Sequence, residues 1–483
     1  MGGPSANPAR VPASRKLAYG IGNIAYSLPY QATASLFMLF ATAILGVPPA
    51  IAGLVGALSI AWDALTDPVV GYLSDHAESP RFGRRHLFIL AGGLGIALFN
   101  YTLWTISPAS SLGLRVGLIA VSLLLLKTAL AVFFVPYLAL GGELSQDYDQ
   151  RSSIQGIRAA FYLVGMILAL FATPVFFFRS TPQFPRGQLN PAAYPRMAVA
   201  SSLVAAIATL VCFLGTRRSI PTLPRRSVEM GREGRSARSV WTNFVEALKN
   251  RELLMLVLMI FVLEAGFQFG IAIGFHVNTY TYGLTGPMIG ALGLVALGTS
   301  VLSQPLWVAF TKRFEKKTAL IAGLAIGFVG FIGAPWTHVW WKIFPIQAPT
   351  LPFTLGAFMV LAGIGNGAFM SIPNSMIADA ADVEELRTGK RDEGLYFGTY
   401  TLAYKAGTAV SWALSGAALA AIHFAPGSTS QSESVRFALA MVPTYLLLAT
   451  APFALYFILR YGITRERWRQ TRAALDARRE PAT

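Results

Sequence analysis

Two carboxylates lie four residues apart within a long apolar segment of the chain. Asp63 and Asp67 are the charged residues of segment 50–73, and Thr66 adds a hydroxyl beside them. On a helix, residues at this spacing share one face. Two ionised carboxylates there repel each other unless a proton, a cation or a basic side chain lies between them. Because carboxylate and hydroxyl oxygens suit small hard cations, the pattern predicts a coupling site for H⁺ or Na⁺. A structural ion pair with another helix is the alternative.

Among the other charged side chains of the apolar segments, four are candidate partners at membrane depth, namely Lys127, Arg158, Glu264 and Lys405. An ionisable group within the hydrocarbon of a membrane is costly unless it is paired or faces water. We therefore expect these side chains to face an interior cavity, where they are candidate partners for the two aspartates. Arg158 has a simpler alternative, because it lies near the start of its segment and can extend its guanidinium to the membrane surface.

The remaining chemistry of the sequence argues against an enzyme. It contains no pairing of a nucleophile with a base, no metal-ligand cluster and no phosphate-binding loop. The net charge of +16 does not indicate nucleic-acid binding, since basic residues concentrate between the apolar blocks. We expect no cofactor other than the coupling ion. A non-transporting membrane sensor is a remote alternative, against which the charges at membrane depth argue.

Apolar blocks predict the elements that carry these residues. Of the 483 residues, 54% are hydrophobic and 13% are charged, whereas soluble proteins carry roughly 25% charge. Blocks of about 20 residues cross the hydrocarbon as helices, whereas a barrel would show short alternating segments. We expect an all-α membrane protein of twelve transmembrane helices, near residues 17–45, 50–73, 86–106, 113–142, 154–178, 196–216, 252–281, 285–311, 317–336, 351–378, 395–422 and 434–459.

Basic residues alternate between the connections and predict the topology. Segment 217–251, turn 312–317 and the C-terminal tail are rich in Lys and Arg, whereas the links near 46–50 and 282–285 carry no charge. The positive-inside rule then places both termini in the cytoplasm, and we expect a bacterial inner-membrane protein. The N-terminus shows no signal-peptide pattern. The single cysteine, Cys212, is expected to be a packing residue.

The chain is predicted to consist of two six-helix bundles. They span residues 1–216 and 252–460, joined by a cytoplasmic linker at 217–251 and followed by a basic cytoplasmic tail at 461–483. The two halves echo each other, because RFGRR at 81–85 corresponds to RFEKK at 313–317. Such correspondence is typical of a duplicated transporter. We expect the protein to be a monomer.

The basic turn of the first half predicts a cytoplasmic gate formed by Asp75, Arg81, Arg84 and Arg85. These side chains would latch against neighbouring helix ends. Anchoring to anionic lipid headgroups is a second interpretation, and it does not exclude the first.

Segment 61–75, AWDALTDPVVGYLSD, resembles the helix II signature of the glycoside–pentoside–hexuronide:cation symporters. This melibiose permease-like family belongs to the major facilitator superfamily. Segment 142–148 with Arg151 and Arg158, and segment 378–407, resemble the same family. The resemblance covers nearly the whole chain. It implies the major facilitator fold, alternating access and symport of a solute with H⁺ or Na⁺.

Carried over by residue, the resemblance makes Asp63 and Asp67 the coupling carboxylates and places Arg158 and Lys405 near the substrate. Ser27 and Phe134 occupy positions where galactoside-binding members have acids, and Ala131 replaces a threonine hydroxyl. These departures leave the sugar and the ion open. The expected substrate or gating cavity comprises Ser27, Lys127, Phe134, Arg158, Glu264, Tyr400, Thr401 and Lys405.

A second resemblance gives an alternative solute. Glu264 in the string LEAG, the turn 311–318 and Thr66 resemble the animal sodium-dependent lysophosphatidylcholine symporters of the same superfamily. Phe133 and Phe134 would suit an acyl chain, although helix packing is the commoner role of phenylalanine. We predict a cation-coupled symporter of a glycoside or sugar-like solute, with a lysophospholipid or other amphipathic lipid as the alternative. Its partners would be this solute and membrane lipids.

Overall fold

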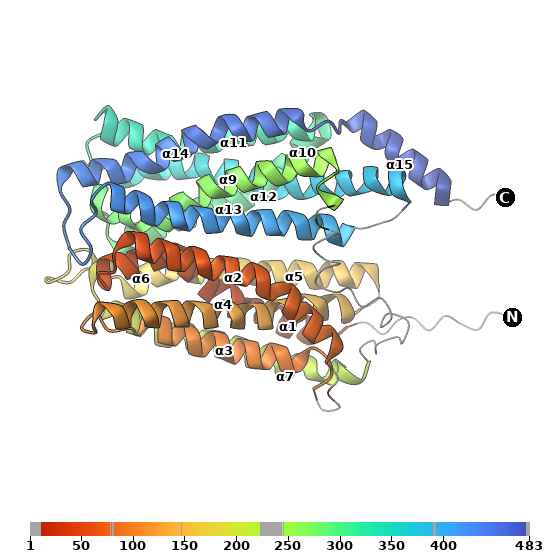
Figure 1. The fold of residues 1–483 in the computed structure, drawn as a ribbon, viewed down its shortest axis with the longest axis horizontal. Helices are drawn as coiled ribbons and strands as arrows, with labels where there is room; N and C mark the ends of the chain where they lie inside the picture. The colour runs from red at the N-terminus through yellow and green to blue at the C-terminus, as the bar shows by residue number, and fades with distance from the viewer. Residues whose placement is uncertain are drawn as a thin grey trace. The chain divides into compact units, whose positions relative to one another are not determined.

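The computed structural model describes residues 11–77, 79, 82–145, 147–222, 244, 246–389 and 393–479. Every regular element within these ranges is helical, and Figure 1 shows most of them as long rods. Arg81 of the predicted gate and most of the predicted linker lie outside the described residues. The helices group into two compact units, each of which is described by itself.

The first unit comprises residues 1–231, 283–290 and 424–430. Its helical elements are α1 (Ala13–Leu39), η1 (Phe40–Ile44), α2 (Pro49–His76), α3 (His86–Trp104), α4 (Leu112–Glu143), α5 (Tyr148–Ile167), η2 (Leu168–Ala172), α6 (Thr173–Phe177), η3 (Gly187–Leu189), α7 (Ala193–Thr216) and η4 (Arg217–Thr222). Within it α1 packs against α5 and α7, α3 against α4 and α7, and α2 against α4. The carboxylate-bearing helix α2 is therefore a neighbour of the lysine-bearing helix α4.

The second unit comprises residues 232–282, 291–423 and 431–483. Its helical elements are α9 (Arg251–His276), η6 (Val277–Thr281), α10 (Gly286–Arg313, whose first residues belong to the first unit), α11 (Lys316–Ala334), η7 (Pro335–Trp340), α12 (Leu351–Thr388), α13 (Glu393–Ala421), α14 (Glu433–Arg460) and α15 (Arg465–Arg479). Helix α9 packs against α13 and α14, α11 against α12, and α15 against α12. The division at 216, 251 and 460 stays a prediction.

Polar side chains cap the N-termini of several helices. Asp147 Oδ1 accepts the N–H of Gln150 at 2.9 Å, at the start of α5. Asn250 Oδ1 accepts the N–H groups of Glu252 and Leu253 at 3.0 and 3.1 Å, at the start of α9. Each side chain accepts a hydrogen bond from a first-turn N–H group that has no partner within the helix. Short local signals therefore decide where these helices start.

Helices α1 and α9 end in the same way, through a π-helical turn followed by a glycine at positive φ. Gly46 has φ 64° after η1, and Gly283 has φ 67° after η6. A side chain is disfavoured in this backbone conformation, and glycine is not. The shared ending adds a structural correspondence to the related turns at 81–85 and 313–317.

Ten helical segments within the described residues are long and apolar enough to cross a membrane. Helices α1 and α13 have 27 and 29 residues, which is also long enough, but they are more polar. Several of their polar side chains are buried, including Asn23 of α1 and Ser411 of α13. These two helices match the remaining two of the twelve predicted segments in position and length. The all-α membrane fold is confirmed.

Small residues allow close helix packing. A Cβ built on Gly365 of α12 would overlap the backbone of Gly327 of α11. A Cβ on Gly22 of α1 would lie 2.8 Å from the sulfur of Cys212 of α7, and this cysteine is fully buried. Cys212 is therefore a packing residue, as expected.

Candidate coupling and substrate site

The carboxylates of α2 lie midway along that helix. Asp63 is only 8% exposed, whereas Asp67 is half-buried. Thr66 Oγ1 donates a hydrogen bond to the carbonyl of Asp63 at 3.2 Å, which leaves lone pairs on the hydroxyl oxygen. The side chains at 63, 66 and 67 share one face of the helix. This oxygen set fits a small hard cation or a shared proton.

A hydrogen bond joins α2 to α4 beside the carboxylates. Trp62 Nε1 donates to Thr128 Oγ1 at 2.9 Å, so the turn of α2 that carries Asp63 faces the turn of α4 that carries Lys127. Lys127 is 6% exposed, and its ammonium lies 4.8 Å from the ring centre of Tyr30 on α1. The aromatic face stabilises the buried ammonium. A base thus lies at the level of the two acids.

An aromatic layer borders this region. The rings of Tyr26 on α1 and Phe134 on α4 stack with centres 3.9 Å apart, and Tyr26 stacks on Tyr30 at 5.3 Å. Tyr26 is also within electrostatic reach of Asp63 and Asp67. Sequence reasoning missed both tyrosines, although their spacing places them on one face of a helix. Phe134 was a predicted cavity residue, and it is half-buried in this layer.

Ser27 and Arg158 lie at the contact of α1 with α5. Ser27 is fully buried, and its Oγ donates to the carbonyl of Asn23 at 2.8 Å. A Cβ on Gly165 of α5 would overlap this oxygen, so the hydroxyl is enclosed between the helices. Arg158 is half-buried, and its Nε donates to Gln155 Oε1 at 2.7 Å.

In the second unit, Glu264 occupies the interior of α9 and is 1% exposed. Gln268 Nε2 donates to Glu264 Oε2 and to the hydroxyl of Tyr404 on α13, both at 2.9 Å. Gly407 permits this close approach of the helices, because a Cβ there would lie 2.6 Å from the carbonyl of Phe261. A buried acid is thereby linked to α13 through one amide.

The other predicted residues of the second unit follow along α13. Lys405 is half-buried and adjacent to Tyr404. Tyr400 lies one turn earlier, within electrostatic reach of Glu264. Thr401 is exposed and donates to the carbonyl of Phe397 at 2.9 Å. Helix α13 therefore carries Lys405, Tyr400 and Thr401 within one turn of Tyr404, which is linked to Glu264 through Gln268.

An ionic network holds the turn between α2 and α3. Arg85 is 6% exposed and lies 2.6 Å from Asp75, 3.0 Å from Glu143 and 2.9 Å from the hydroxyl of Ser74. Arg84 reaches the same Glu143 oxygen at 2.8 Å. Three of the four predicted gate residues therefore gather with one carboxylate at the end of α4.

The second unit has a corresponding ion pair. Lys316 Nζ lies 2.6 Å from Asp379 Oδ2, and Lys316 occupies the position of Arg84 in the related turn. The structure thereby adds Glu143 and Asp379 to the predicted gate set, of which Arg81 lies outside the described residues. Both acids could have been found from the sequence, because each follows a proline of its helix: Glu143 follows Pro136 in α4, and Asp379 follows Pro373 in α12.

The donor set is not that of a transition-metal centre. Within the part of the chain that the structure describes, no group of three or more His, Cys, Asp and Glu residues could hold a metal ion. Asp63 and Asp67 would bind Na⁺ with the Thr66 hydroxyl and backbone carbonyls as further oxygens.

Helices that cross a membrane, charges buried at their centres and ionic networks at their ends define a multi-pass membrane transporter. Residues 18–465 match the family described as MFS/sugar transport protein. The chain belongs to this family, whose members are transporters and not enzymes. The predicted major facilitator membership and transporter class are confirmed.

Similar proteins cover nearly the whole chain. An uncharacterised symporter of Synechocystis sp. is 27% identical over 96% of this chain and 97% of its own. The sodium-dependent lysophosphatidylcholine symporter 1-A of Danio rerio is 24% identical over 94% and 86%, and the glucuronide carrier protein homolog of Escherichia coli is 22% identical over 96% and 95%. Among solved structures, a bacterial homologue of the lysosomal transporter Spinster has a TM-score of 0.64 at 14% identity, covering 98% of this chain and 100% of that one. That likeness shows the fold.

Proposed function

We propose that this protein accumulates a small solute by symport with H⁺ or Na⁺ through alternating access. The observation that carries the proposal is that Asp63 and Asp67 lie on α2, which packs against the helix α4 that carries the buried Lys127. Two acids and one base at membrane depth have a charge balance that a bound proton or cation changes. An ion that binds one conformation better than another shifts the equilibrium between them.

The solute that we propose first is a glycoside or sugar-like molecule. The stacked pair of Tyr26 and Phe134 offers a flat face next to charged groups. A sugar ring can place its C–H bonds on such a face and its hydroxyls on the charged side chains. The glucuronide carrier homolog among the relatives agrees with this choice.

A lysophospholipid or another amphipathic lipid is the second candidate. Ser27 is enclosed between helices, and Phe134 supplies no polar atom, so neither offers the hydrogen bonds that a sugar needs. An acyl chain would pack on the aromatic layer instead. The Danio rerio relative agrees with this choice.

Uptake into proteoliposomes under imposed H⁺ or Na⁺ gradients tests the proposal. Purified protein is first screened with methyl glycosides, glucuronides and lysophosphatidylcholine, because a ligand that binds the native state raises its melting temperature. We expect one class to stabilise the protein and to accumulate only under an ion gradient. Binding without gradient-driven accumulation would contradict symport and favour a sensor.

We further propose a bacterial inner-membrane location with both termini in the cytoplasm and a monomeric state. The location is supported by an inner membrane symporter of Escherichia coli among the relatives, 26% identical to this chain. The basic connections supply the orientation.

A further inference from the structure

A basic pocket is lined by the end of α10, the start of α11 and the start of α15, which packs against α12. Its volume is about 290 Å³. Four cations line it, namely Lys312, Lys316, Arg465 and Arg469. Two carboxylates, Glu315 and Asp379, share this lining, so positive charge is in excess.

Both acids contact residues of the pocket's own wall. Asp379 pairs with Lys316 at 2.6 Å, and Glu315 accepts the backbone N–H of Arg465 at 3.0 Å. The Arg465 guanidinium donates to the carbonyl of Thr311 at 2.7 Å, which fixes its direction. Two carboxylates against four cations leave the pocket with excess positive charge.

Lys312 and Arg469 form the unneutralised part of the pocket. Both side chains are exposed, and neither has a carboxylate partner among the described residues. They come from different helices, α10 and α15, yet line one pocket. An anion with several oxygens, such as a phosphate group, would satisfy both cations at once.

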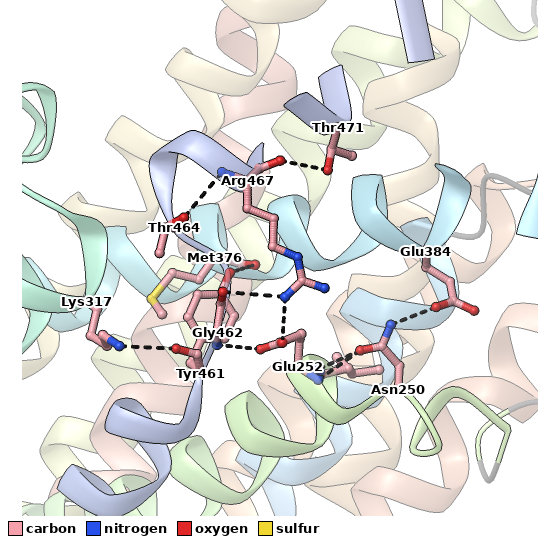
Figure 2. Close-up of polar contacts among 11 residues, drawn as sticks. Asn250, Glu252, Lys317, Met376, Glu384, Tyr461, Gly462, Thr464, Arg467 and Thr471 are labelled. Atoms are coloured by element: carbon pink, nitrogen blue, oxygen red, sulfur yellow. Dashed lines mark hydrogen bonds and ion pairs between the residues drawn. The ribbon is translucent and has the colours of Figure 1, made fainter. Parts of the chain in front are cut away.

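The start of α15 is held in place before any ligand arrives, as Figure 2 shows. Glu252 lies 3.1 Å from Arg467 and accepts the N–H of Gly462 at 2.6 Å. The hydroxyl of Tyr461 donates to the carbonyl of Met376 at 3.0 Å. Burial, reinforced by nearby carboxylates, raises the pKa of Tyr461 well above its ordinary value, so this donor stays protonated. The basic wall of the pocket is thus preorganised.

The position of the pocket favours a lipid over a free anion. Helix α10 ends at Arg313 and α11 starts at Lys316, and both are candidate membrane spans. Their ends therefore lie near the lipid phosphates. Val308 is 51% exposed and lies one turn before Lys312, which gives an acyl chain an apolar surface next to the cations. Trp468, another lining residue, is typical of the membrane interface.

We propose that this pocket binds the phosphate of an anionic phospholipid, with Lys312 and Arg469 as its charge partners. A zwitterionic lipid also carries a phosphate, but its ammonium would be repelled by the excess positive charge of the pocket. The pocket therefore selects phosphatidylglycerol over phosphatidylethanolamine.

Native mass spectrometry of the full chain tests this with phosphatidylglycerol, phosphatidylethanolamine and inorganic phosphate as probes. The wild type is expected to bind phosphatidylglycerol about tenfold more tightly than phosphatidylethanolamine. The double variant Lys312→Gln/Arg469→Gln is expected to lose this preference. The matched control Arg313→Gln/Arg460→Gln removes the same charge at exposed helix ends outside the pocket and is expected to keep it.

Melting temperatures measured without lipid establish that both double variants fold. Equal lipid preference in the pocket variant and the control would overturn the proposal, as would a wild type that does not distinguish the two lipids. Displacement of phosphatidylglycerol by millimolar inorganic phosphate, with loss of that competition in the pocket variant, would overturn the lipid as the source of the phosphate.

Discussion

The free energy of a carboxylate at membrane depth depends chiefly on what neutralises it. Asp63 is buried, whereas Asp67 is half-buried one turn away. The more accessible acid is the better candidate for ion exchange with water, and the buried acid for fixing the local field. We therefore assign the coupling event first to Asp67.

Asp67→Asn should abolish gradient-driven accumulation, because the amide resembles a protonated acid and cannot release a proton or bind a cation by charge. We expect accumulation to fall more than about tenfold, while exchange of solute down its own gradient persists. Both are measured in proteoliposomes. Wild-type accumulation in this variant would exclude Asp67 from coupling.

Lys127→Ala should shift coupling from H⁺ toward Na⁺. We propose that the buried ammonium competes with Na⁺ for the same carboxylates, and we therefore expect H⁺ to be the preferred ion of the wild type. Removing that repulsion should raise apparent Na⁺ affinity on the order of tenfold. The control Lys127→Arg keeps the charge and should keep the wild-type preference. Strong Na⁺ stimulation of the wild type at constant pH would contradict the assignment.

Individual residues were only partly predictable. The charged residues at membrane depth could be found in the sequence, because few positions in an apolar block carry charge. The contacts around each charge could not be predicted. The side chains of Trp62 and Thr128, and those of Gln268 and Tyr404, come together only after folding. Ser27 was expected at the cavity by resemblance, but its side-chain direction depends on how α1 meets α5.

Among the elements, the α2–α3 turn depends on one arginine more than on its exposed partner. Arg85→Gln removes the buried guanidinium from Asp75, Glu143 and Ser74, while Arg84 still pairs with Glu143. It should therefore destabilise the protein by about 1–3 kcal/mol. Asp75→Asn should cost less than about 1 kcal/mol, because the Asp75 side chain is 57% exposed. Unfolding in detergent micelles measures both. Equal losses would mean that the network is not held by the buried arginine.

The α9–α13 contact depends on the absence of a side chain at Gly407. Gly407→Ala should destabilise the protein by about 1–3 kcal/mol, since the added Cβ would lie 2.9 Å from that of Glu264. Gly398→Ala on the same helix is the control, because a Cβ there meets no atom within 4 Å. It should be neutral or slightly stabilising. A harmless Gly407→Ala would show that the helices can separate at no cost.

For the whole molecule, composition and block length were sufficient to predict an all-helical membrane fold. Hydrophobicity within each block is strong enough for ten segments, and α1 and α13 were predictable only by length and position. Helix order gives no packing angles or pairings, because those follow from side-chain shape at contacts such as Gly365 with Gly327. The grouping of residues 283–290 and 424–430 with the first unit had no sequence signal.

The proposed topology can be measured with reporter fusions. A fluorescent protein joined after Thr483 should fluoresce in intact bacteria, and alkaline phosphatase at the same place should be inactive, because the basic tail is expected in the cytoplasm. A fusion after Leu284 is the control, since it follows seven predicted spans and should give active phosphatase. Active phosphatase at the C-terminus would reverse the orientation.

The burial of Cys212 against Gly22 has a practical consequence for spectroscopy. The chain's one thiol is enclosed between α1 and α7, so maleimides should leave the native protein unlabelled. A cysteine placed at an exposed position outside the predicted site, such as Ala421 at the end of α13, would then accept a single spin label or fluorophore without prior removal of Cys212. Pairs of such labels would report the distance changes of the transport cycle on an otherwise unaltered background.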